Sequence, residues 1–489
     1  MRYIKKEDLA ISLRDLSGIL QMLSVVMLVP IITTIYYPES YSPLNIFDKS
    51  LAFIIPSLIL YLMYRVLKRI KTTEESRTRH IMITIALAWF IIGVVGALPF
   101  IIRGILTPVD SLFESMSGWT TTGFSMIREF ESAPRDLLFY RGLTQGVGGL
   151  GVISLGLMVL LHGGRAGLGY VDMGVYKIKP GVKSTIRETW KIYLFYIVLG
   201  VVLLWIAGMS LFDAINHSMA AVATGGFSTH SDIGYYNNFW IEVVLIFLML
   251  AGMTNFLIHY RVFNKDFKAL RSSEVKYTLA LILIAVAVIS ISVYGKDIPG
   301  VNTYSIADIL RKTVFHVVAG MSTCGFNTVD FGKWPEIAQT TVILLMYVGG
   351  MAASTAGGIR VIRFVIIMKS IRYSVKKLVL PKTAVVSMKV DDNVVKESEV
   401  VYVLGYSAVY ALSAIVGATL LMYLGYTTVQ SLFTIISAMG NDGLGVVSGV
   451  IWYNMPTAGK LIVTFFMWIG RIEIYPFLLI VREFLVRAH

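Results

Sequence analysis

The stretch TTTGFS, residues 120–125, is a polar turn with a glycine between two apolar segments, and the chain repeats it three times. The later copies read ATGGFS at 223–228, STCGFN at 322–327 and GNDGLG at 440–445. Their aligned glycines are Gly123, Gly226, Gly325 and Gly443. These glycines are 103, 99 and 118 residues apart, which indicates a fourfold repeat of a whole structural unit. Four such turns can meet at one axis, where backbone carbonyls bind a dehydrated cation.

The composition indicates a membrane protein. Hydrophobic residues make up 56% of the 489 residues, charged residues only 15%, and the mean hydropathy is +0.71. A soluble protein has about 25% charged residues. Many apolar runs are long enough to cross the ~30 Å hydrocarbon layer. Because the alternating pattern of a membrane β-barrel is absent, the sequence predicts an all-α polytopic membrane protein.

The charge and cysteine content narrow the function classes. The net charge of +13 could suggest nucleic-acid binding, but the basic residues lie in short loops between spans, so membrane orientation explains them and no nucleic acid is expected. The single cysteine, Cys324, excludes an intrachain disulfide and a CxxC metal site. The chain also offers no catalytic nucleophile or paired carboxylates, so we do not expect an enzyme.

Ten transmembrane helices are predicted. Two lead the chain, at about 16–37 and 51–69, and four units follow, each with a long span, a short apolar run, a glycine turn and a second long span. The paired spans lie at about 80–102 and 137–161, 190–210 and 239–260, 275–294 and 338–368, and 399–424 and 458–482. The short runs are 110–119, 212–223, 306–321 and 428–439. The resulting divisions are 1–78 for the two additional N-terminal helices, then pore repeats at 79–165, 186–262, 272–372 with a broken second helix, and 396–489.

The short runs are too short to cross a bilayer, so we interpret them as re-entrant helices. The non-helical turn after each one must line a water- or ion-filled cavity, because unpaired backbone cannot face lipid. Each short helix directs its partly negative C-terminal end at that cavity, which favours a cation over an anion. The fold class is therefore four pseudo-symmetric units around one pore.

The distribution of lysine and arginine predicts the orientation. One set of loops and termini holds 32 of the 43 basic residues: 1–14, 65–79, 163–191, 260–276, 360–397 and 482–489. The positive-inside rule makes that side cytoplasmic, with both termini on it. The four glycine turns then open to the outside of the cytoplasmic membrane.

With these motifs in order, the sequence resembles the Trk/Ktr/HKT superfamily of potassium uptake proteins, and within it the TrkH type. QGVGGLG at 145–151 is similar to the family's Q-x-x-G-G-x-G run, and GGMAASTAGGIR at 349–360 is similar to its broken third-repeat helix. GRIE at 470–473 is similar to its G-R-x-E motif. The two leading spans resemble the extra pair of TrkH-type members. The resemblance covers almost the whole chain.

The resemblance implies a potassium filter in which main-chain carbonyls replace the hydration shell of the ion, which is the transported substrate. Its residues would be Thr121, Thr122, Gly123, Thr224, Gly225, Gly226, Thr323, Cys324, Gly325, Asn441, Asp442 and Gly443. In the plant branch a serine at the first glycine goes with sodium transport, so four glycines imply potassium. The alternative for each turn is an ordinary outer loop. Asp442 could place a charge near the ion, but we favour a structural Asx-type hydrogen bond.

The resemblance also implies a gate below the filter, a mobile loop that moves aside on activation. Its residues would be Gly349, Gly350, Ser354, Thr355, Gly357, Gly358 and Arg471. The alternative for the glycine-rich run is tight helix packing. An arginine inside an apolar span is costly and faces a cavity or a partner. The alternative for Arg471 is an ion pair with an acid such as Glu473, but residues two apart do not face each other on one helix.

Two further motifs favour structural interpretations. Gly146, Gly148 and Gly151 satisfy G-x-G-x-x-G, but no strand precedes them, so we reject a dinucleotide site and expect close helix packing. His217 and His316 lie in the short helices, where we expect packing rather than ligand roles.

The predicted function is channel-like potassium uptake across the cytoplasmic membrane. The resemblance implies a homodimer and cytoplasmic TrkA-type regulatory subunits that carry the nucleotide, with no cofactor on this chain. The basic segment 369–397 is a candidate dock for them, or only positive-inside charge. The alternatives are a potassium symporter coupled to protons or sodium, which requires a buried acid in a span where none is evident, and a membrane-embedded enzyme, for which convergent catalytic groups are absent.

Overall fold

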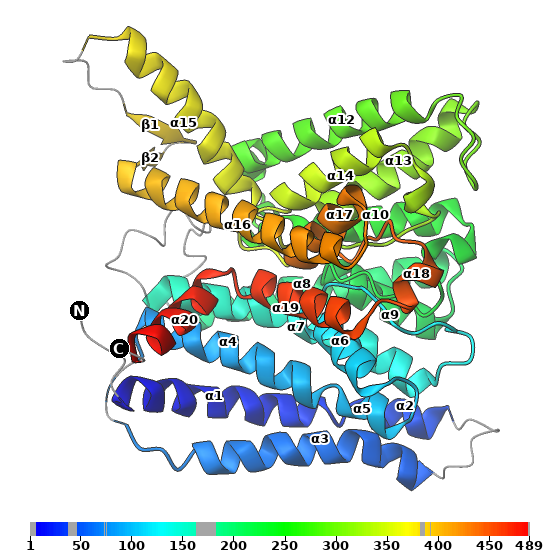
Figure 1. Cartoon of the computed structure of the whole chain (residues 1–489), viewed down its shortest axis with the longest axis vertical. Helices are drawn as coiled ribbons and strands as arrows, with labels where there is room; N and C mark the ends of the chain where they lie inside the picture. The colour runs from blue at the N-terminus through cyan, green and yellow to red at the C-terminus, as the bar shows by residue number, and fades with distance from the viewer. Residues whose placement is uncertain are drawn as a thin grey trace.

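A computed structural model describes residues 6–37, 46–72, 74, 76–162, 182–381, 387–391 and 393–487. Its helices lie side by side in one bundle, as Figure 1 shows. Within the described part of the chain, the regular strands are β1 (Met388–Val390) and β2 (Asn393–Val395), which form an antiparallel hairpin. The prediction of a mostly helical polytopic membrane protein is confirmed, and the hairpin is an addition to it.

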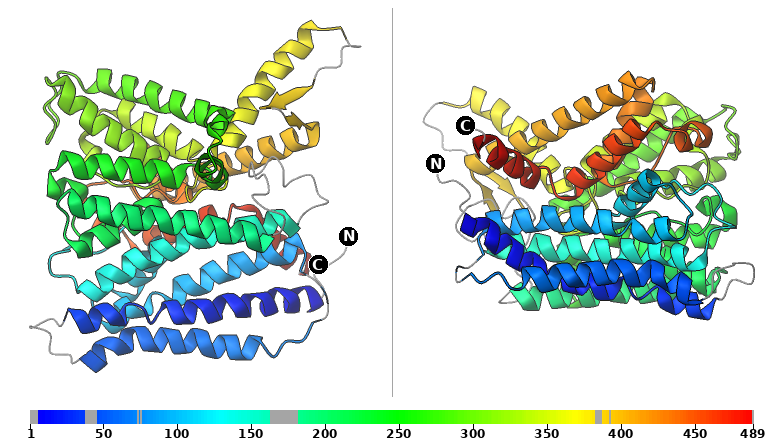
Figure 2. Two further views of the ribbon diagram at one scale, coloured as in Figure 1. Left: turned by 180° about the vertical axis from the view of Figure 1, so that it is seen from behind. Right: turned by 60° about the horizontal axis from the view of Figure 1, so that its bottom comes forward.

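The N-terminal helices form a pair that packs on the first repeat. Helix α1 (Lys6–Val26) continues past Pro30 into α2 (Ile31–Tyr36), and α3 (Ile46–Leu67) runs beside α1. Helix α1 also packs on α4 (Thr78–Val95), as the two views in Figure 2 agree. The buried residues of this packing include Leu16, Leu20, Phe53, Leu60, Ala86 and Trp89.

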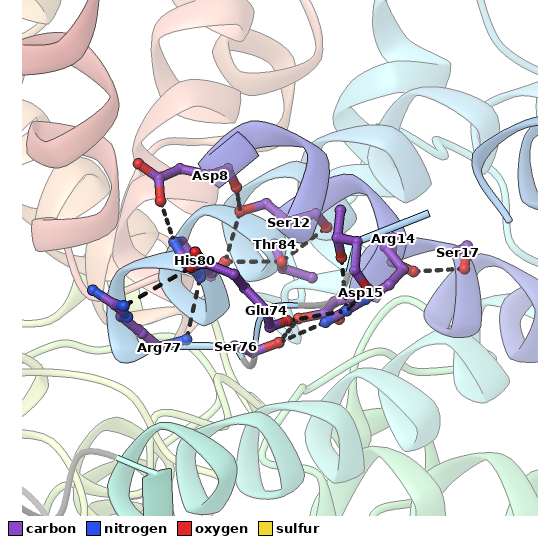
Figure 3. A network of polar contacts seen from close by, with 11 residues as sticks. Asp8, Ser12, Arg14, Asp15, Ser17, Glu74, Ser76, Arg77, His80 and Thr84 are labelled. Atoms are coloured by element: carbon purple, nitrogen blue, oxygen red, sulfur yellow. Dashed lines mark hydrogen bonds and ion pairs between the residues drawn. The ribbon is translucent and has the colours of Figure 1, made fainter. Parts of the chain in front are cut away.

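A polar network joins the start of α1 to the start of α4 (Figure 3). The Nε2 atom of His80 lies 2.9 Å from Oδ1 of Asp8, and Ser12 Oγ donates to the His80 carbonyl oxygen at 3.2 Å. Thr84 Oγ1 donates to the carbonyl oxygen of Ser12 at 3.1 Å. All four residues are buried, and their polar groups are costly to leave unpaired. The network therefore fixes the N-terminal pair in register with the first repeat.

Four similar units follow, each with an outer helix, a short helix, a glycine turn and a further helix or helix pair. The first unit contains α4, α5 (Leu98–Ile102), α6 (Pro108–Trp119) and α7 (Arg135–His162), and the second contains α8 (Val182–Ile206), α9 (Leu211–Val222), α10 (Phe239–Met253) and α11 (Phe256–Phe263). The third contains α12 (Ser273–Val293), α13 (Ile306–Met321), α14 (Glu336–Val348) and α15 (Val361–Val379). The fourth contains α16 (Glu397–Tyr423), α17 (Thr428–Gly440), α19 (Thr457–Arg471) and α20 (Tyr475–Arg487). The connections hold the short helices η1 (Ile233–Tyr236), η2 (Phe267–Arg271), η3 (Phe331–Lys333) and α18 (Gly449–Tyr453).

The short helices α6, α9, α13 and α17 lie where the sequence predicts the re-entrant runs. Each begins at a hydroxyl side chain that accepts a hydrogen bond from the backbone N–H three residues later. The caps are Thr107 to Asp110 at 3.3 Å, Ser210 to Asp213 at 3.1 Å, Ser305 to Asp308 at 3.4 Å and Thr427 to Gln430 at 3.3 Å. Each cap stabilises its helix start by about 0.5–2 kcal/mol. The repeated cap gives all four short helices the same starting point.

Six helical segments of the described residues are long and apolar enough to cross a bilayer, and up to eight when each of two bent pairs counts as one span. The six are Asp8–Tyr36, Ile46–Leu67, Thr78–Ile102, Ser184–Ile206, Ser273–Val293 and Glu397–Tyr423. Helix α7 and the pair α14 and α15 lie where the two remaining spans are predicted. The third repeat is interrupted at residues 349–360, within the predicted broken helix.

Two predicted spans are each formed by a sharply bent pair of helices, so neither is one straight helix. The run 239–260 bends by 104° between α10 and α11, and the run 458–482 bends by 105° between α19 and α20. At the first bend, Asn255 Oδ1 accepts the N–H of Leu257 at 3.0 Å and starts a new helix. At the second bend, Glu473 and Ile474 have φ values of 61° and 49°, which a right-handed helix cannot contain.

The first and last helices of the described chain have their terminal ends on one side of the bundle. Helix α1 begins and α20 ends on the same side of the molecule (Figure 1). On that side α15 projects away from the other helices in Figures 1 and 2, and the β1–β2 hairpin lies between α15 and the start of α16. Residues Ile371, Val375, Leu378 and Val379 of α15 are exposed there.

Candidate functional site

The four glycine turns share one backbone conformation. The residue two before each glycine has a left-handed φ of 52–54°, although none of these residues is glycine. They are Thr121 (54°), Thr224 (52°), Thr323 (54°) and Asn441 (53°). Left-handed non-glycine residues are uncommon and cost about 1–3 kcal/mol each, so they persist only where the surroundings hold them. The same strained angle at four equivalent positions shows that the turns are copies in structure as well as in sequence.

The turns also close into a ring. Each central glycine has a positive φ, and a Cβ there would collide with the carbonyl oxygen that precedes the glycine of another turn. The contacts run from Gly123 to Gly225, from Gly226 to Cys324, from Gly325 to Asp442, and from Gly443 to Thr122. The fourth contact returns to the first turn, so the four backbones surround one axis. This ring brings together all twelve residues that the resemblance assigns to the filter.

Hydrogen bonds hold the first and fourth turns together. Asn441 Nδ2 donates to Thr122 Oγ1 at 3.1 Å and to the Met467 carbonyl oxygen at 2.9 Å. Asp442 Oδ1 accepts the N–H of Leu444 at 3.0 Å, which is the Asx-type hydrogen bond that the sequence analysis favours. The other carboxylate oxygen of Asp442 is buried without a hydrogen-bond partner among the described residues. The Asx-type hydrogen bond is therefore present in the fourth turn.

A buried ion pair supports the first two turns from behind, and the sequence analysis missed it. Arg141 Nε lies 2.7 Å from Oε1 of Glu114, and the Arg141 side chain also donates to the Ser228 carbonyl oxygen at 2.8 Å. Glu114 accepts the N–H of Met126 at 2.7 Å and the hydroxyl of Ser125 at 3.0 Å. The Glu114 carboxylate thus fixes residues 125 and 126, which follow the central glycine of the first turn, and is linked through Arg141 to the second turn.

In the first three units, the residue nine before the central glycine is a buried titratable residue that packs in the short helix next to its turn. Glu114 occupies this position in the first unit, and His217 occupies it in the second, with Nε2 at 3.0 Å from Ser228 Oγ and Nδ1 at 2.8 Å from the Asp213 carbonyl oxygen. His316 occupies it in the third and stacks on Phe331 with ring centroids 5.3 Å apart. The histidines pack and hydrogen-bond as expected. The common offset is the signal that could have identified Glu114 from sequence.

Gln145, which the sequence analysis identified only as part of the run 145–151, is a second support. Its Nε2 donates to the Gly225 carbonyl oxygen at 2.5 Å, and its Oε1 accepts the N–H of Phe227 at 3.0 Å. The glycines that follow Gln145 allow close packing: a Cβ on Gly148 would collide with the Trp119 carbonyl, and one on Gly151 would lie 3.0 Å from the ring of Trp89. The G-x-G-x-x-G run is therefore a helix-packing surface, as expected.

The loop 349–360 lies against the ring. Thr355 Oγ1 is 3.3 Å from Thr224 Oγ1, and the N–H of Gly357 donates to Thr323 Oγ1 at 2.8 Å. A Cβ on Gly357 would collide with the carbonyl oxygen of Gly440, where the fourth turn begins. The loop therefore contacts three of the four turns directly.

Close backbone packing explains the other glycines of this loop. Gly349 has a φ of 72° and Gly358 a φ of 79°, and a Cβ on Gly349 would collide with the Gly357 carbonyl. A Cβ on Gly350 would collide with the methyl group of Ala356. Ser354 Oγ donates to the Met351 carbonyl oxygen at 2.6 Å and is buried. The loop is thus a compact buried segment.

Arg471 reaches this loop from the end of α19. Its guanidinium donates to the carbonyl oxygen of Thr355 and to that of Gly148, both at 3.1 Å. The residue is 6% exposed, and among the described residues no carboxylate forms an ion pair with it. The ion pair with Glu473 that the sequence left open is not formed, because Glu473 binds Arg360 and Arg363, each at 2.8 Å. Arg471 therefore places an uncompensated positive charge next to the loop.

No cluster of three or more histidine, cysteine or acidic side chains suited to a metal ion occurs in the described parts of the chain. Cys324 is buried and free. The groups that converge on the axis are backbone carbonyls and hydroxyls, which suit a weakly held alkali cation.

Comparisons with known proteins agree with this geometry. The family model described as "TrkH: Cation transport protein" matches residues 45–486. An uncharacterized cation transporter of Methanocaldococcus jannaschii is 34% identical over 98% of this chain and 96% of its own length. The Trk system potassium uptake protein TrkH of Escherichia coli K12 is 32% identical over 84% of this chain and 86% of its own length.

The same relation is found among solved structures. The crystal structure of the potassium transporter TrkH from Vibrio parahaemolyticus superposes with a TM-score of 0.84 and 27% identity. The match covers 96% of this chain and 98% of the crystallised one. The likeness therefore includes the N-terminal pair of helices and all four repeats.

Proposed function

Because the chain belongs to the TrkH family of cation transport proteins, we propose that it takes up potassium through a channel-like filter formed by its four glycine turns. Potassium uptake as the activity is supported by the curated relatives and by the crystallised potassium transporter. The observation that carries the filter is the closed ring, in which each central glycine contacts the carbonyl of another turn. A ring of this kind offers backbone oxygens from four sides to one dehydrated ion.

The electrostatics of the site favour a cation. The short helices α6, α9, α13 and α17 each end at a glycine turn. Their C-terminal ends carry partial negative charge, and four such ends near one axis stabilise a positive ion there. Inward movement of potassium would follow its electrochemical gradient, with about 2.3 kcal/mol per charge for each 100 mV of membrane potential.

The loop 349–360 is proposed to be the gate. It is buried beneath the ring, hydrogen-bonds the second and third turns, and is held by Arg471. A plug in this position blocks the inner exit of the filter. The charge of Arg471 adds an electrostatic barrier to cations, since intramembrane charges act strongly at low dielectric. Opening requires the loop to leave Thr224, Thr323 and Arg471.

The membrane arrangement is proposed from charge and from the bundle. Ten spans would place both termini and the basic loops in the cytoplasm and the glycine turns toward the outside of the cytoplasmic membrane. The same-side ends of α1 and α20 support this arrangement (Figure 1). Loop 163–191 contributes to this count of basic residues, and its residues 163–181 lie outside the described part of the chain.

The partners and ligands are likewise proposed. The chain would form a homodimer and bind cytoplasmic TrkA-type regulatory subunits, with the nucleotide on those subunits and no cofactor on this chain beyond the transported potassium. The Trk system names of the curated relatives support a multicomponent assembly. The projecting end of α15 and the β1–β2 hairpin, within the basic segment 369–397, would be the dock.

Reversal potentials in proteoliposomes test the function. Potassium and sodium gradients are varied independently at two pH values. A reversal potential that follows the potassium gradient alone supports a potassium-selective pore. A shift with pH or sodium in a fixed ratio would instead establish the symporter and overturn the channel-like mechanism.

A further inference from the structure

A buried carboxylate that the proposed filter and gate do not use lies against the loop 349–360. Glu274 is in the first turn of α12 and is 6% exposed. Its Oε1 accepts the N–H of Ala352 at 2.8 Å, and its Oε2 lies 3.5 Å from Nδ2 of Asn255. Among the described residues no lysine, arginine or histidine forms an ion pair with it. A buried carboxyl group is costly to leave without hydrogen bonds, so the contact with Ala352 stabilises both the side chain and the loop. This side chain also corrects the sequence analysis, which found no buried acid at a span.

The loop residues beside Glu274 are fixed to the bend between α10 and α11. The N–H of Met351 donates to the Met253 carbonyl oxygen at 3.0 Å, and the N–H of Phe256 donates to the Ala353 carbonyl oxygen at 3.3 Å. Ala353 has a φ of 48°, which is strained for a residue other than glycine. The hydrogen bonds of Met351 and Ala353 to this bend join two backbones, whereas the N–H of Ala352 donates to a side chain, that of Glu274 on α12. That carboxylate is therefore the contact that a movement of α12 would break.

The β1–β2 hairpin holds the start of α12. The N–H and the hydroxyl of Ser273 both donate to Oδ1 of Asp391, at 2.9 and 2.7 Å. Asp391 lies directly after β1, and Ser273 directly precedes Glu274. The carboxylate of Asp391 thus fixes the first turn of the helix that presents Glu274 to the loop.

The hairpin is in turn attached to α15, the helix that begins where the loop ends. Lys369 Nζ on α15 donates to the Lys389 carbonyl oxygen of β1 at 2.9 Å. Met388, Val390 and Val395 of the hairpin are buried in the core that also contains Val365 of α15. A displacement of the hairpin therefore acts on both ends of the loop: on residue 352 through α12 and on residue 360 through α15.

We propose that Glu274 is a positioning residue that holds the loop 349–360 in its blocking position, and that the β1–β2 hairpin controls this hold through Asp391 and Ser273. The inference rests on the proposed gate. Movement of the hairpin away from Ser273 frees the first turn of α12, withdraws Glu274 from Ala352, and releases the loop. Regulation from the projecting side would thus reach the filter without a contact to the filter itself.

Single-channel recordings in planar bilayers test the inference. Glu274→Ala is expected to raise the open probability about tenfold, since it removes the hydrogen bond that holds Ala352, while conductance and reversal potential stay at wild-type values. Glu274→Gln keeps an acceptor oxygen and is expected to restore the open probability to within about threefold of wild type. Asp391→Ala, on the exposed hairpin, is expected to raise it less than Glu274→Ala does.

Glu336→Ala is the matched control. Glu336 is also a first-turn carboxylate, at the start of α14, but it is exposed and lies outside the hairpin and the segment 369–397, so the open probability is expected not to change. Thr355→Ala tests the gate directly. If Thr355→Ala raises the open probability and neither Glu274→Ala nor Asp391→Ala does, the inference is overturned and the gate remains. If none of the three changes it, the proposed gate itself fails. A change in conductance or selectivity with Glu274→Ala would also overturn the positioning role, because it would indicate a distorted filter.

Discussion

The ring of glycine turns and the loop 349–360 touch each other, yet they differ in symmetry. The ring repeats one strained backbone angle, within 52–54°, in four places. The loop occurs once, in the third repeat, and contacts the turns through unlike groups such as Thr355 and Gly357. An ion on an axis is bound best by equivalent oxygens on all sides, whereas a plug needs a single segment that can leave. The comparison indicates that symmetry was retained in the proposed filter and lost in the proposed gate.

The largest effect is expected from breaking the ring. In Gly226→Ala, the added methyl group would collide with the Cys324 carbonyl at a φ of 74°, so the second and third turns must separate. Distortion that costs about 1.4 kcal/mol already changes a rate tenfold, so potassium flux into proteoliposomes should fall at least about tenfold.

Gly445→Ala is the control for this change, because a Cβ there meets only Phe124 at 3.8 Å and its φ is not positive. Equal flux in the two variants would show that the ring contact is not needed for conduction.

The next effect concerns the support behind the ring. Glu114→Ala leaves Arg141 buried without its carboxylate and removes the acceptor for Met126. Breaking a buried ion pair costs about 3–5 kcal/mol, so the Tm of the purified protein should fall and flux should fall with it. Glu129→Ala removes an exposed carboxylate near the same turn and should leave both unchanged. An unaltered Tm in Glu114→Ala would contradict the supporting role.

The loop side of the comparison is tested by Arg471→Gln. The change removes the positive charge next to Thr355 and weakens the hydrogen bonds that hold the loop. Because hydrogen bonds to charged groups contribute about 1.5–3 kcal/mol, rubidium uptake should rise about tenfold with unchanged ion selectivity. Arg482→Gln, at an exposed position of α20, serves as the control. A fall in uptake would show that Arg471 supports conduction instead of limiting it.

The smallest effect is expected at Asp442. Asp442→Asn keeps an oxygen that can accept the Leu444 N–H, so the turn keeps its shape. Flux and the potassium-to-sodium permeability ratio should both change by less than about twofold. A larger loss of selectivity would mean that the carboxylate charge acts on the ion directly.

The sequence alone predicts the repeated parts well, for a physical reason. The short helices lie within two residues of their predicted bounds, because each has a capping hydroxyl at its start and a glycine turn at its end. The bends at Asn255 and Glu473 were missed, because the apolar runs continue on both sides of them. Gly252, Gly470 and Pro476 lie within three residues of the bends and are the signals that could have indicated them. The supporting roles of Glu114, Arg141 and Gln145 were missed because their partners lie on other elements, and only the fold brings these together.

The location of the ion tests the central claim most directly. Crystals of the protein grown with rubidium or thallium in place of potassium would be measured at the absorption edge of the ion. The account predicts anomalous density on the axis enclosed by the turns at Gly123, Gly226, Gly325 and Gly443. Ordered ions found elsewhere in the bundle, with none inside this ring, would contradict it.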